Sequence, residues 1–177
     1  MQLVVVESDQ VDAATRQALR ALWDRAFGDR FSDEDADHAY GGVHVLACAG
    51  DRLVGHASAV PRRIRFGDLP WRTVGYVEAV ATDPDHQGRH VGLRTMERLH
   101  EEIRSCWPVA MLSTGRATGF YERLGWERWR GLSCTRTATG VVPDGEHGGL
   151  MILRCDPSFV TDLSVTVTCE DRPGDAW

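Results

Sequence analysis

Residues 77–98 constrain the possible fold more than any other segment, because their pattern is typical of a strand followed directly by a turn and a helix. Residues 72–82 are rich in Val, Tyr and Thr, which favours a strand, and Pro84 ends that pattern. After the turn at Gln87 and Gly88, apolar residues recur at helical spacing, at Val91, Leu93, Met96, Leu99 and Ile103. A helix that begins there leaves its first N–H groups without acceptors, and such groups bind phosphate.

The rest of the chain alternates short apolar segments with turns and helical stretches, so we expect an α+β fold with a mixed central sheet flanked by helices. We expect further strands at residues 3–6, 43–49, 53–59, 109–113, 126–129 and 150–155. An early helix, capped by Asp9 or Asp12, is expected to bury an apolar line formed by Val11, Ala14, Ala18, Leu22 and Ala26. Residues 28–37 and 140–149 are expected to be polar loops. No linker or repeat divides the chain, which predicts one domain over residues 1–177.

Composition excludes several classes of protein. The chain has no lysine among its 20 basic residues, which rules out lysine-assisted phosphoryl transfer and Schiff-base chemistry. A net charge of −6 argues against a general nucleic-acid binder. We expect Arg62, Arg63 and Arg65 to be solvated on an edge strand. No apolar segment approaches the roughly 20 residues that span a bilayer.

The five cysteines are scattered and never spaced C-x-x-C, which predicts reduced, mostly buried thiols in a cytoplasmic protein. His86 and His90 are four residues apart, but Gly88 and a turn separate them and no third ligand is evident. We therefore expect no metal site.

The segment Gln87-Gly88-Arg89-His90-Val91-Gly92 resembles the acetyl-CoA pyrophosphate loop of the GCN5-related N-acetyltransferases (GNAT). That family usually has Arg or Gln, two residues, a glycine, one residue, and then glycine or alanine. His90 replaces the first expected glycine, which in the family lets phosphate approach the backbone. A capped surface helix is the alternative interpretation of this segment.

A second segment, residues 119–126 (GFYERLGW), resembles a later motif of the same family, in which a short helix carries a tyrosine and is followed by glycine and an aromatic residue. The residues alone predict a helix that buries Phe120 and Leu124 and ends at Gly125. Both interpretations hold together, because Tyr121 points to a different side of the helix. The resemblance implies that Tyr121 lies near the acetyl-CoA sulfur and protonates the leaving thiolate.

Three further segments are similar to aminoglycoside 2′-N-acetyltransferases, namely residues 75–81, 28–42 and 169–177. The resemblance extends from about Thr15 to the last residue, and the terminal Gly-Asp-Ala-Trp is its most specific part. It implies acetyl-CoA as cofactor, an aminoglycoside as cationic small-molecule substrate, and a homodimer. The cofactor would be held by the backbone of a strand end and of the loop after it, at Val80, Ala81, Thr82, Gln87, Gly88, Arg89, His90, Val91 and Gly92.

Glu78 is the candidate base. Because side chains alternate along a strand, Tyr76, Glu78, Val80 and Thr82 are expected to share one face. A carboxylate in such an apolar strand costs energy unless it is paired or functional. We therefore expect Glu78 to take the ammonium proton of the substrate through water, and the alternative is an ion pair with one of the arginines.

A polycationic substrate requires carboxylates and carbonyls around it. Carried over from the resemblance, the expected contacts are Asp29 or Asp35, Glu78 with the Ala79 backbone, Ser113, Asp144 or Glu146, Asp175, and Trp177 with its terminal carboxylate. Two alternatives remain open. One keeps the chemistry but changes the acceptor to a polyamine, a cell-wall precursor or a protein N-terminus. The other is a GNAT protein that binds a ligand without catalysis, and His90 in the loop is its best support.

Overall fold

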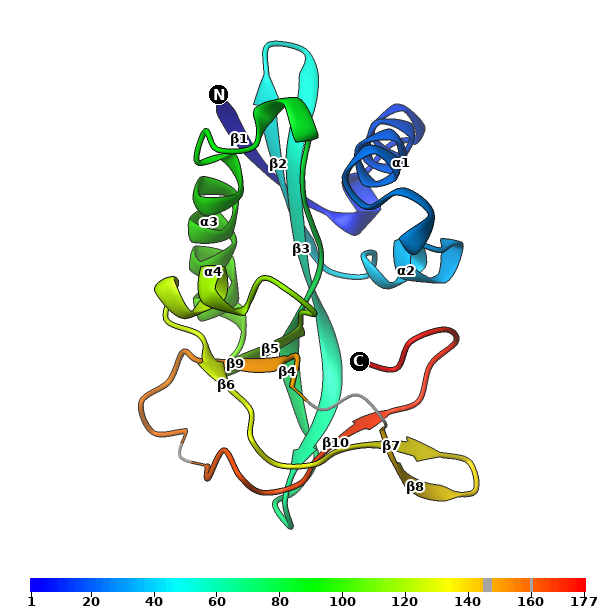
Figure 1. Cartoon of the computed structure of the whole chain (residues 1–177), viewed down its shortest axis with the longest axis vertical. Coiled ribbons are helices and arrows are strands. Elements are labelled where there is room, and N and C mark those ends of the chain that lie inside the picture. Colours follow the sequence, from blue (N-terminus) through cyan, green and yellow to red (C-terminus); the bar gives the residue numbers. More distant parts are fainter. Residues whose placement is uncertain (145–147, 160) are drawn as a thin grey trace. The chain divides into compact units, whose positions relative to one another are not determined.

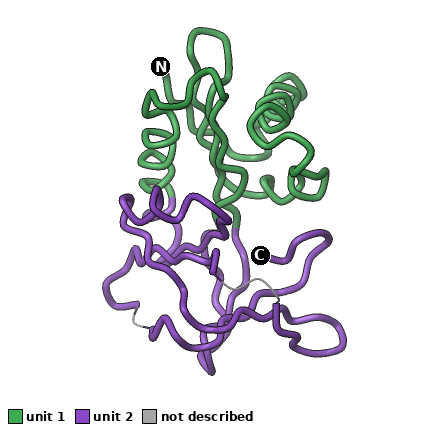
Figure 2. The backbone as a smooth tube through the Cα atoms, viewed as in Figure 1, with its two compact units in different colours: residues 1–60, 77–102 green, residues 61–76, 103–177 purple. Residues whose placement is uncertain are grey.

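The computed structural model describes residues 1–144, 148–159 and 161–177. Its backbone divides into two compact units, of which unit 1 comprises residues 1–60 and 77–102 and unit 2 comprises residues 61–76 and 103–177 (Figure 2). Two long strands, β3 (Arg52–Phe66) and β4 (Arg72–Thr82), contribute residues to both units. The expected single domain over residues 1–177 stays a prediction.

The strands form a mixed sheet with the hydrogen-bonded order β6-β9-β5-β4-β3-β10-β7-β8, while β2 pairs with both β1 and β3 (Figure 1). The pairs β4–β5 and β7–β10 are parallel, whereas β1–β2 and β2–β3 are antiparallel. The expected mixed sheet with helices is confirmed. The other strands are β1 (Gln2–Glu7), β2 (Val43–Ala49), β5 (Val109–Ser113), β6 (Glu127–Arg128), β7 (Ser133–Thr137), β8 (Gly140–Pro143), β9 (Leu150–Arg154) and β10 (Val167–Glu170).

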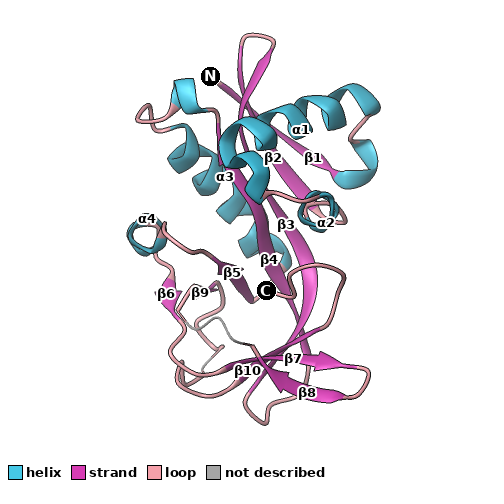
Figure 3. Cartoon of the chain, turned by 45° about the vertical axis from the view of Figure 1, so that its right-hand side comes forward, coloured by secondary structure: helices cyan, strands magenta, loops and turns pink. Residues whose placement is uncertain are grey.

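In unit 1, helices α1 (Ala13–Phe27) and α3 (Val91–Cys106) lie on opposite sides of β2 and β3 (Figure 1, Figure 3). The strand pattern explains this, because successive side chains point to opposite faces. Leu46 packs with Leu22 of α1, whereas the next residue, Ala47, packs with Val91 of α3. Strand β2 is therefore buried on both faces.

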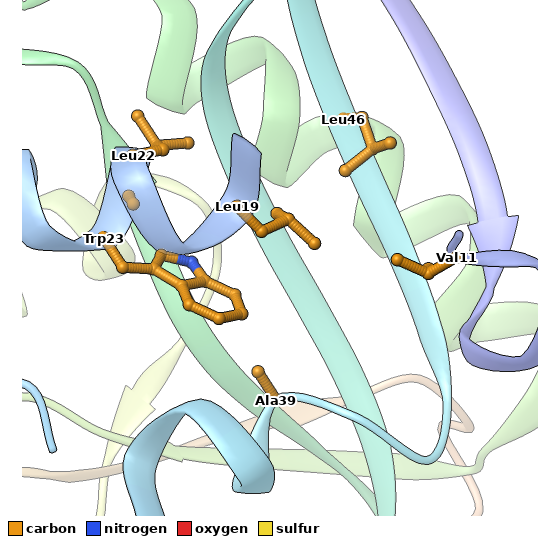
Figure 4. Close-up of a cluster of buried hydrophobic side chains, with 7 residues drawn as sticks. Val11, Leu19, Leu22, Trp23, Ala39 and Leu46 are labelled. Carbon is orange, nitrogen blue, oxygen red and sulfur yellow. The ribbon is translucent and has the colours of Figure 1, made fainter. Parts of the chain in front are cut away.

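Helix α1 begins where the sequence predicts, since the Asp12 carboxylate accepts the Thr15 N–H at 2.8 Å. The predicted buried line is confirmed at Val11 and Leu22 but wrong at Ala14 and Ala18, which are exposed. The helix also buries Leu19 and Trp23, which the predicted line left out (Figure 4). Leucine and tryptophan remove far more apolar surface from water than alanine, so they decide which face of the helix turns inward.

The two segments expected as loops contain regular structure. A short 3-10 turn, Gly28–Arg30, precedes helix α2 (Asp33–His38). Ser32 and Asp35 form a capping box, in which each side chain accepts the other residue's backbone N–H, and this explains the helix. Residues 140–143 form strand β8, which pairs antiparallel with β7. Strands β7 and β10 were not expected either.

In unit 2, β5 pairs with β4 at Gly75↔Ala110 and Tyr76↔Met111, and β9 pairs with β5 over its full length. Strand β10 pairs with β3 at Phe66, Arg65 and Ile64. The expectation that the arginines of this segment lie on an edge strand is therefore wrong, because β10 covers that edge.

Candidate active site

The turn between β4 and α3 presents the start of a helix with free backbone donors. Gly88 and His90 both adopt left-handed backbone conformations, with φ of 73° and 60°. The Arg94 N–H donates to the His90 carbonyl at 3.0 Å, so the preceding N–H groups at the start of α3 have no acceptor in the helix. The conformation of His90 also explains why glycine is usual there, since a Cβ atom disfavours positive φ.

This turn fits a pyrophosphate group. Residues 87–90 are exposed, and a Cβ atom on Gly88 would meet nothing within 4 Å. The N-terminus of α3 carries a partial positive charge, and Arg89 adds a full one next to it. Open backbone, helix dipole and cation together suit an anionic ligand.

Asp83 anchors the beginning of this turn. Its carboxylate accepts hydrogen bonds from Arg25 at 3.0 Å, from Arg52 at 2.7 Å and from the Asp85 N–H at 2.9 Å. Burial opposes ionisation of Asp83, but the hydrogen bonds from Arg25, Asp85 and Arg52 outweigh it and hold the pKa of its carboxyl well below the usual range. Asp83 therefore stays ionised and ties α1 and β3 to the turn.

Glu78 lies on β4 and is half-buried. The next residue, Ala79, has φ of 50°, which is left-handed and distorts the strand, although β4 continues to Thr82. The expected alternation that places Tyr76, Glu78, Val80 and Thr82 on one face is therefore broken at Ala79. Beyond it, Val80 and Thr82 are half-buried and Ala81 is buried.

Tyr121 is the buried residue of helix α4 (Thr118–Arg123), at 7% exposure. The prediction that Phe120 and Leu124 form the buried face is wrong, since both are only half-buried. The predicted end at Gly125 is confirmed, because this residue has φ of 88° and its N–H donates to the Glu122 carbonyl at 3.0 Å. Burial raises the pKa of the Tyr121 phenol, which keeps the proton on its oxygen at neutral pH.

The segment 169–177 is tied to unit 2 by Arg62. The guanidinium donates to the Ala176 carbonyl at 2.6 Å and to the Glu170 carbonyl at 2.9 Å. The Trp177 N–H donates to the Asp175 carboxylate at 3.0 Å, and Trp177 is only 7% exposed. The tail is therefore folded onto its unit.

Sequence reasoning missed Arg62, which is 8% exposed instead of solvated. Strand alternation could have found it, because Val60, Arg62, Ile64 and Phe66 share one parity in β3 and all four are buried. A charged residue in that pattern requires partners, and the tail carbonyls supply them.

The other expected substrate contacts are distributed over both units. In unit 1, Asp29 is exposed in the 3-10 turn, and the Asp35 carboxylate accepts the Ser32 N–H at 2.8 Å. In unit 2, Ser113 is exposed at the end of β5 and Asp144 is half-buried after β8. Glu146 lies outside the described residues. Each of these assignments stays a prediction.

All five cysteines are free thiols, as expected, but only Cys134 and Cys169 are buried. Across residues 1–144, 148–159 and 161–177, no group of three or more His, Cys, Asp or Glu side chains could hold a metal ion. No helix among the described residues has both the length and the apolar character to span a bilayer.

A mixed sheet with flanking helices, together with a helix N-terminus whose backbone donors are free after β4, is the architecture of the acyl-CoA-dependent N-acyltransferases. The chain belongs to the GNAT acetyltransferase family, because residues 8–129 match the acetyltransferase (GNAT) domain. Members of this family use acetyl-CoA, which is accordingly the cofactor of this chain.

Individual relatives are more specific. An aminoglycoside 2′-N-acetyltransferase from Mycolicibacterium fortuitum is 32% identical over 177 residues, which cover 98% of this chain and 90% of that protein. A GNAT-family N-acetyltransferase from Escherichia coli, crystallised with CoA, superposes with a TM-score of 0.68 at 13% identity, covering 95% of this chain and 88% of that one. An aminoglycoside 6′-N-acetyltransferase in complex with coenzyme A gives a TM-score of 0.60 at 17% identity, covering 87% and 98%. The two structures show the fold alone.

Proposed function

We propose that this chain transfers the acetyl group of acetyl-CoA to the 2′-amino group of aminoglycosides, and that it acts as a cytoplasmic homodimer. The observation that carries the proposal is the 32% identity to an aminoglycoside 2′-N-acetyltransferase over 98% of the chain. The tail, residues 169–177, resembles that subgroup as well, and the general GNAT fold does not require such a tail. A tail with a role in the site should be held in place, and the Arg62 guanidinium donates a hydrogen bond to its Ala176 carbonyl.

Different backbone segments would bind different parts of acetyl-CoA. Acetyl-CoA supplies an activated acetyl thioester. The backbone of residues 80–82 would bind the pantetheine arm as an added strand. The N–H groups of the turn from Gln87 to Gly92 would bind the pyrophosphate, with Arg89 beside them.

Proton transfer falls to two side chains. Glu78 would accept a proton from the substrate ammonium through water, which leaves a neutral amine as nucleophile. Tyr121 would give its phenolic proton to the departing thiolate, and its raised pKa keeps that proton available. The attacking nitrogen loses a second proton as the amide forms, and this proton would restore the Tyr121 phenol. The overall reaction then releases one proton, which Glu78 would pass to water.

The remaining carboxylates would bind the other ammonium groups. Asp29 or Asp35 in unit 1 and Asp144 or Glu146 in unit 2 are the candidates, together with Ser113, Asp175 and Trp177 of unit 2. Charge-assisted hydrogen bonds of this kind are about twice as strong as neutral ones. Asp29 is the stronger candidate of its pair, because the Asp35 carboxylate already caps helix α2.

Paired substrates test the proposal. We expect steady-state acetylation of an aminoglycoside that carries a 2′-amine, and at least about 100-fold slower turnover of the matched compound with a 2′-hydroxyl. Similar rates for both would remove the 2′ assignment. An absence of turnover with every aminoglycoside, together with acetylation of a polyamine, a cell-wall precursor or a protein N-terminus, would favour the alternative acceptor.

A further inference from the structure

Unit 1 contains a buried chain of polar side chains that the proposed mechanism does not use. His44 on β2 and His56 on β3 both have 0% exposure. Ser8 Oγ lies 2.8 Å from His44 Nε2, and His44 Nδ1 lies 3.0 Å from His56 Nε2. This row of hydrogen-bonded side chains ends at β4, where His56 Nδ1 lies 2.8 Å from the Ala79 carbonyl oxygen. Buried polar groups require such hydrogen-bond partners, but burying two linked imidazoles to provide them costs desolvation free energy.

The hydrogen bonds of this chain can run in two directions. If His56 carries its proton on Nδ1, it donates to the Ala79 carbonyl, and its Nε2 accepts from His44 Nδ1–H. If His56 carries its proton on Nε2, its Nδ1 accepts from Trp23 Nε1–H at 3.2 Å and faces the Ala79 carbonyl at 2.8 Å. The second arrangement brings two acceptors to 2.8 Å, whereas the first leaves two N–H donors, of Trp23 and His56, facing each other at 3.2 Å. The acceptor pair is the closer contact, which favours the first arrangement.

The hydrogen bonds of Ser8, at the end of this row away from β4, favour the arrangement in which His56 carries its proton on Nδ1. Ser8 Oγ already accepts the N–H groups of Gly41 at 2.8 Å and Gly42 at 3.0 Å, which occupy its two lone pairs. The Gly42 carbonyl already accepts the Ser8 N–H at 2.9 Å. The Ser8 hydroxyl proton has two acceptors within 2.8 Å, the second lone pair of the Gly42 carbonyl oxygen and His44 Nε2. Because no lone pair of Ser8 Oγ remains to accept an N–H of His44, the His44 proton lies on Nδ1. Both imidazoles are neutral, since burial lowers the pKa of His44 to about 4 and of His56 to about 3.

The receiving carbonyl belongs to the distorted residue of β4. A non-glycine residue at φ of 50° is strained and persists only where its surroundings hold it. Two side chains of β3 supply that support, because Ser58 Oγ donates to the Glu78 carbonyl at 3.3 Å and His56 lies against the Ala79 carbonyl. Glu78 lies on one side of the distortion and residues 80–82 lie on the other.

We propose that His56, fixed in its Nδ1-protonated form by His44 and Ser8, is a positioning residue that holds the Ala79 carbonyl and thereby orients Glu78 and the cofactor-binding end of β4. The inference rests on the proposed function, because it assigns Glu78 and residues 80–82 their roles. His56 touches neither substrate nor cofactor in this account. It acts only through the backbone of Ala79.

Two variants of His56 separate positioning from general packing. Asparagine places an amide near the position of Nδ1 and keeps a donor for Ala79, whereas glutamine places its amide near Nε2 and loses that donor. We expect His56→Asn to keep kcat within about threefold of the parent chain, and His56→Gln to lower kcat by about tenfold or more, because small displacements of reacting groups are costly. The temperature of thermal unfolding should fall by a similar amount in both variants. Equal losses of kcat in the two variants, or none in His56→Gln, would overturn the proposal.

A measurement on the parent chain keeps the test independent of activity and of variant folding. Nitrogen-15 correlation spectra of the histidine side chains distinguish an imidazole protonated on Nδ1 from one protonated on Nε2. We expect the Nδ1–H form for both His44 and His56 at pH 7. An Nε2–H form of His56 overturns the inference, whereas a parent chain that acetylates no aminoglycoside but shows Nδ1–H refutes only the proposed function.

Discussion

Ala79 adopts a backbone conformation that glycine would adopt with less strain. Its φ of 50° costs about 1–2 kcal/mol for an L-residue, while glycine in the folded chain costs about 0.5–1 kcal/mol in entropy. We therefore expect Ala79→Gly to raise the free energy of unfolding by about 0.5–1 kcal/mol in urea titrations. The matched control is Ala81→Gly, in a buried and regular part of β4, which should lower it. Destabilisation by both variants would contradict the argument from strain.

Glu78 is the residue on which the proposed proton transfer depends. Glu78→Gln keeps the shape of the side chain but removes its basicity, so we expect kcat at pH 7 to fall by about 100-fold or more with little change in KM for acetyl-CoA. Glu97→Gln, at an exposed position of α3, is the control and should leave both constants unchanged. Turnover at the parent rate by Glu78→Gln would leave Glu78 no role as base.

Tyr121 is the residue proposed to protonate the departing thiolate. Tyr121→Phe removes only the hydroxyl, so we expect the chemical step to slow by about 100-fold while the affinity for acetyl-CoA stays within about twofold. Single-turnover kinetics and calorimetry separate the two quantities. If binding weakens in proportion to the rate, the hydroxyl binds the cofactor instead of protonating the thiolate.

At the scale of elements, the tail depends on one buried guanidinium. Hydrogen bonds from a charged group contribute about 1.5–3 kcal/mol, and Arg62 makes two of them to tail carbonyls. We expect Arg62→Gln to lower the free energy of unfolding by at least about 2 kcal/mol and to expose residues 170–177 to limited proteolysis.

Arg63 provides the control for this prediction. It lies next to Arg62 but is exposed, and its contact with Glu170 is an ion pair at 3.7 Å. Exposed pairs contribute little, so Arg63→Gln should change stability by less than about 1 kcal/mol. Equal proteolysis of the two variants would show that Arg62 does not hold the tail.

Elements with strong local patterns could be predicted from the sequence. The β-rich run of β4, the start of α3 at Val91 and the extent of β5 all agree with the structure, because each combines a clear periodicity with a turn or proline at its end. Sequence patterns could not predict the buried face of α1, the helix α2 or the strand β8. Alanine and short polar segments have weak preferences, so tertiary packing decides which face is buried and which secondary structure forms.

The candidate site shows the same division. The turn from Gln87 to Gly92 and the residues Glu78 and Tyr121 could be proposed from local motifs, and their roles stay predictions. Strand alternation indicates that Arg62 is buried, but neither its partners nor the role of His56 could be predicted, because both residues contact carbonyls distant in the sequence. The distortion at Ala79 was missed for a related reason, since alanine does not signal a positive φ.

At the scale of the whole molecule, the buried histidines make stability depend on pH. Burial, reinforced by the charge of Arg16, lowers the pKa of His44 to about 4, and burial together with His44 lowers that of His56 to about 3. In the unfolded chain both groups titrate near 6.5, so below this pH the unfolded state binds more protons than the folded state. Stability is therefore complete above pH 6.5 and falls as the pH decreases toward 4.

The expected slope follows from this difference in bound protons. Each histidine contributes at most about 1.4 kcal/mol per pH unit between pH 6 and pH 4, and His44 contributes less as the pH approaches its folded pKa of about 4. Urea unfolding at several pH values measures the effect, and replacing His44 by Asn should reduce the slope by about half. A free energy of unfolding that stays constant from pH 7 to pH 4.5 would contradict the buried, neutral state of the pair.

The position of the transferred acetyl group tests the central claim most directly. The measurement is an NMR assignment of the product formed from acetyl-CoA and an aminoglycoside that carries a 2′-amine among several other amines. We expect a single monoacetylated product with the new amide at the 2′ nitrogen. A product acetylated at any other nitrogen would contradict it.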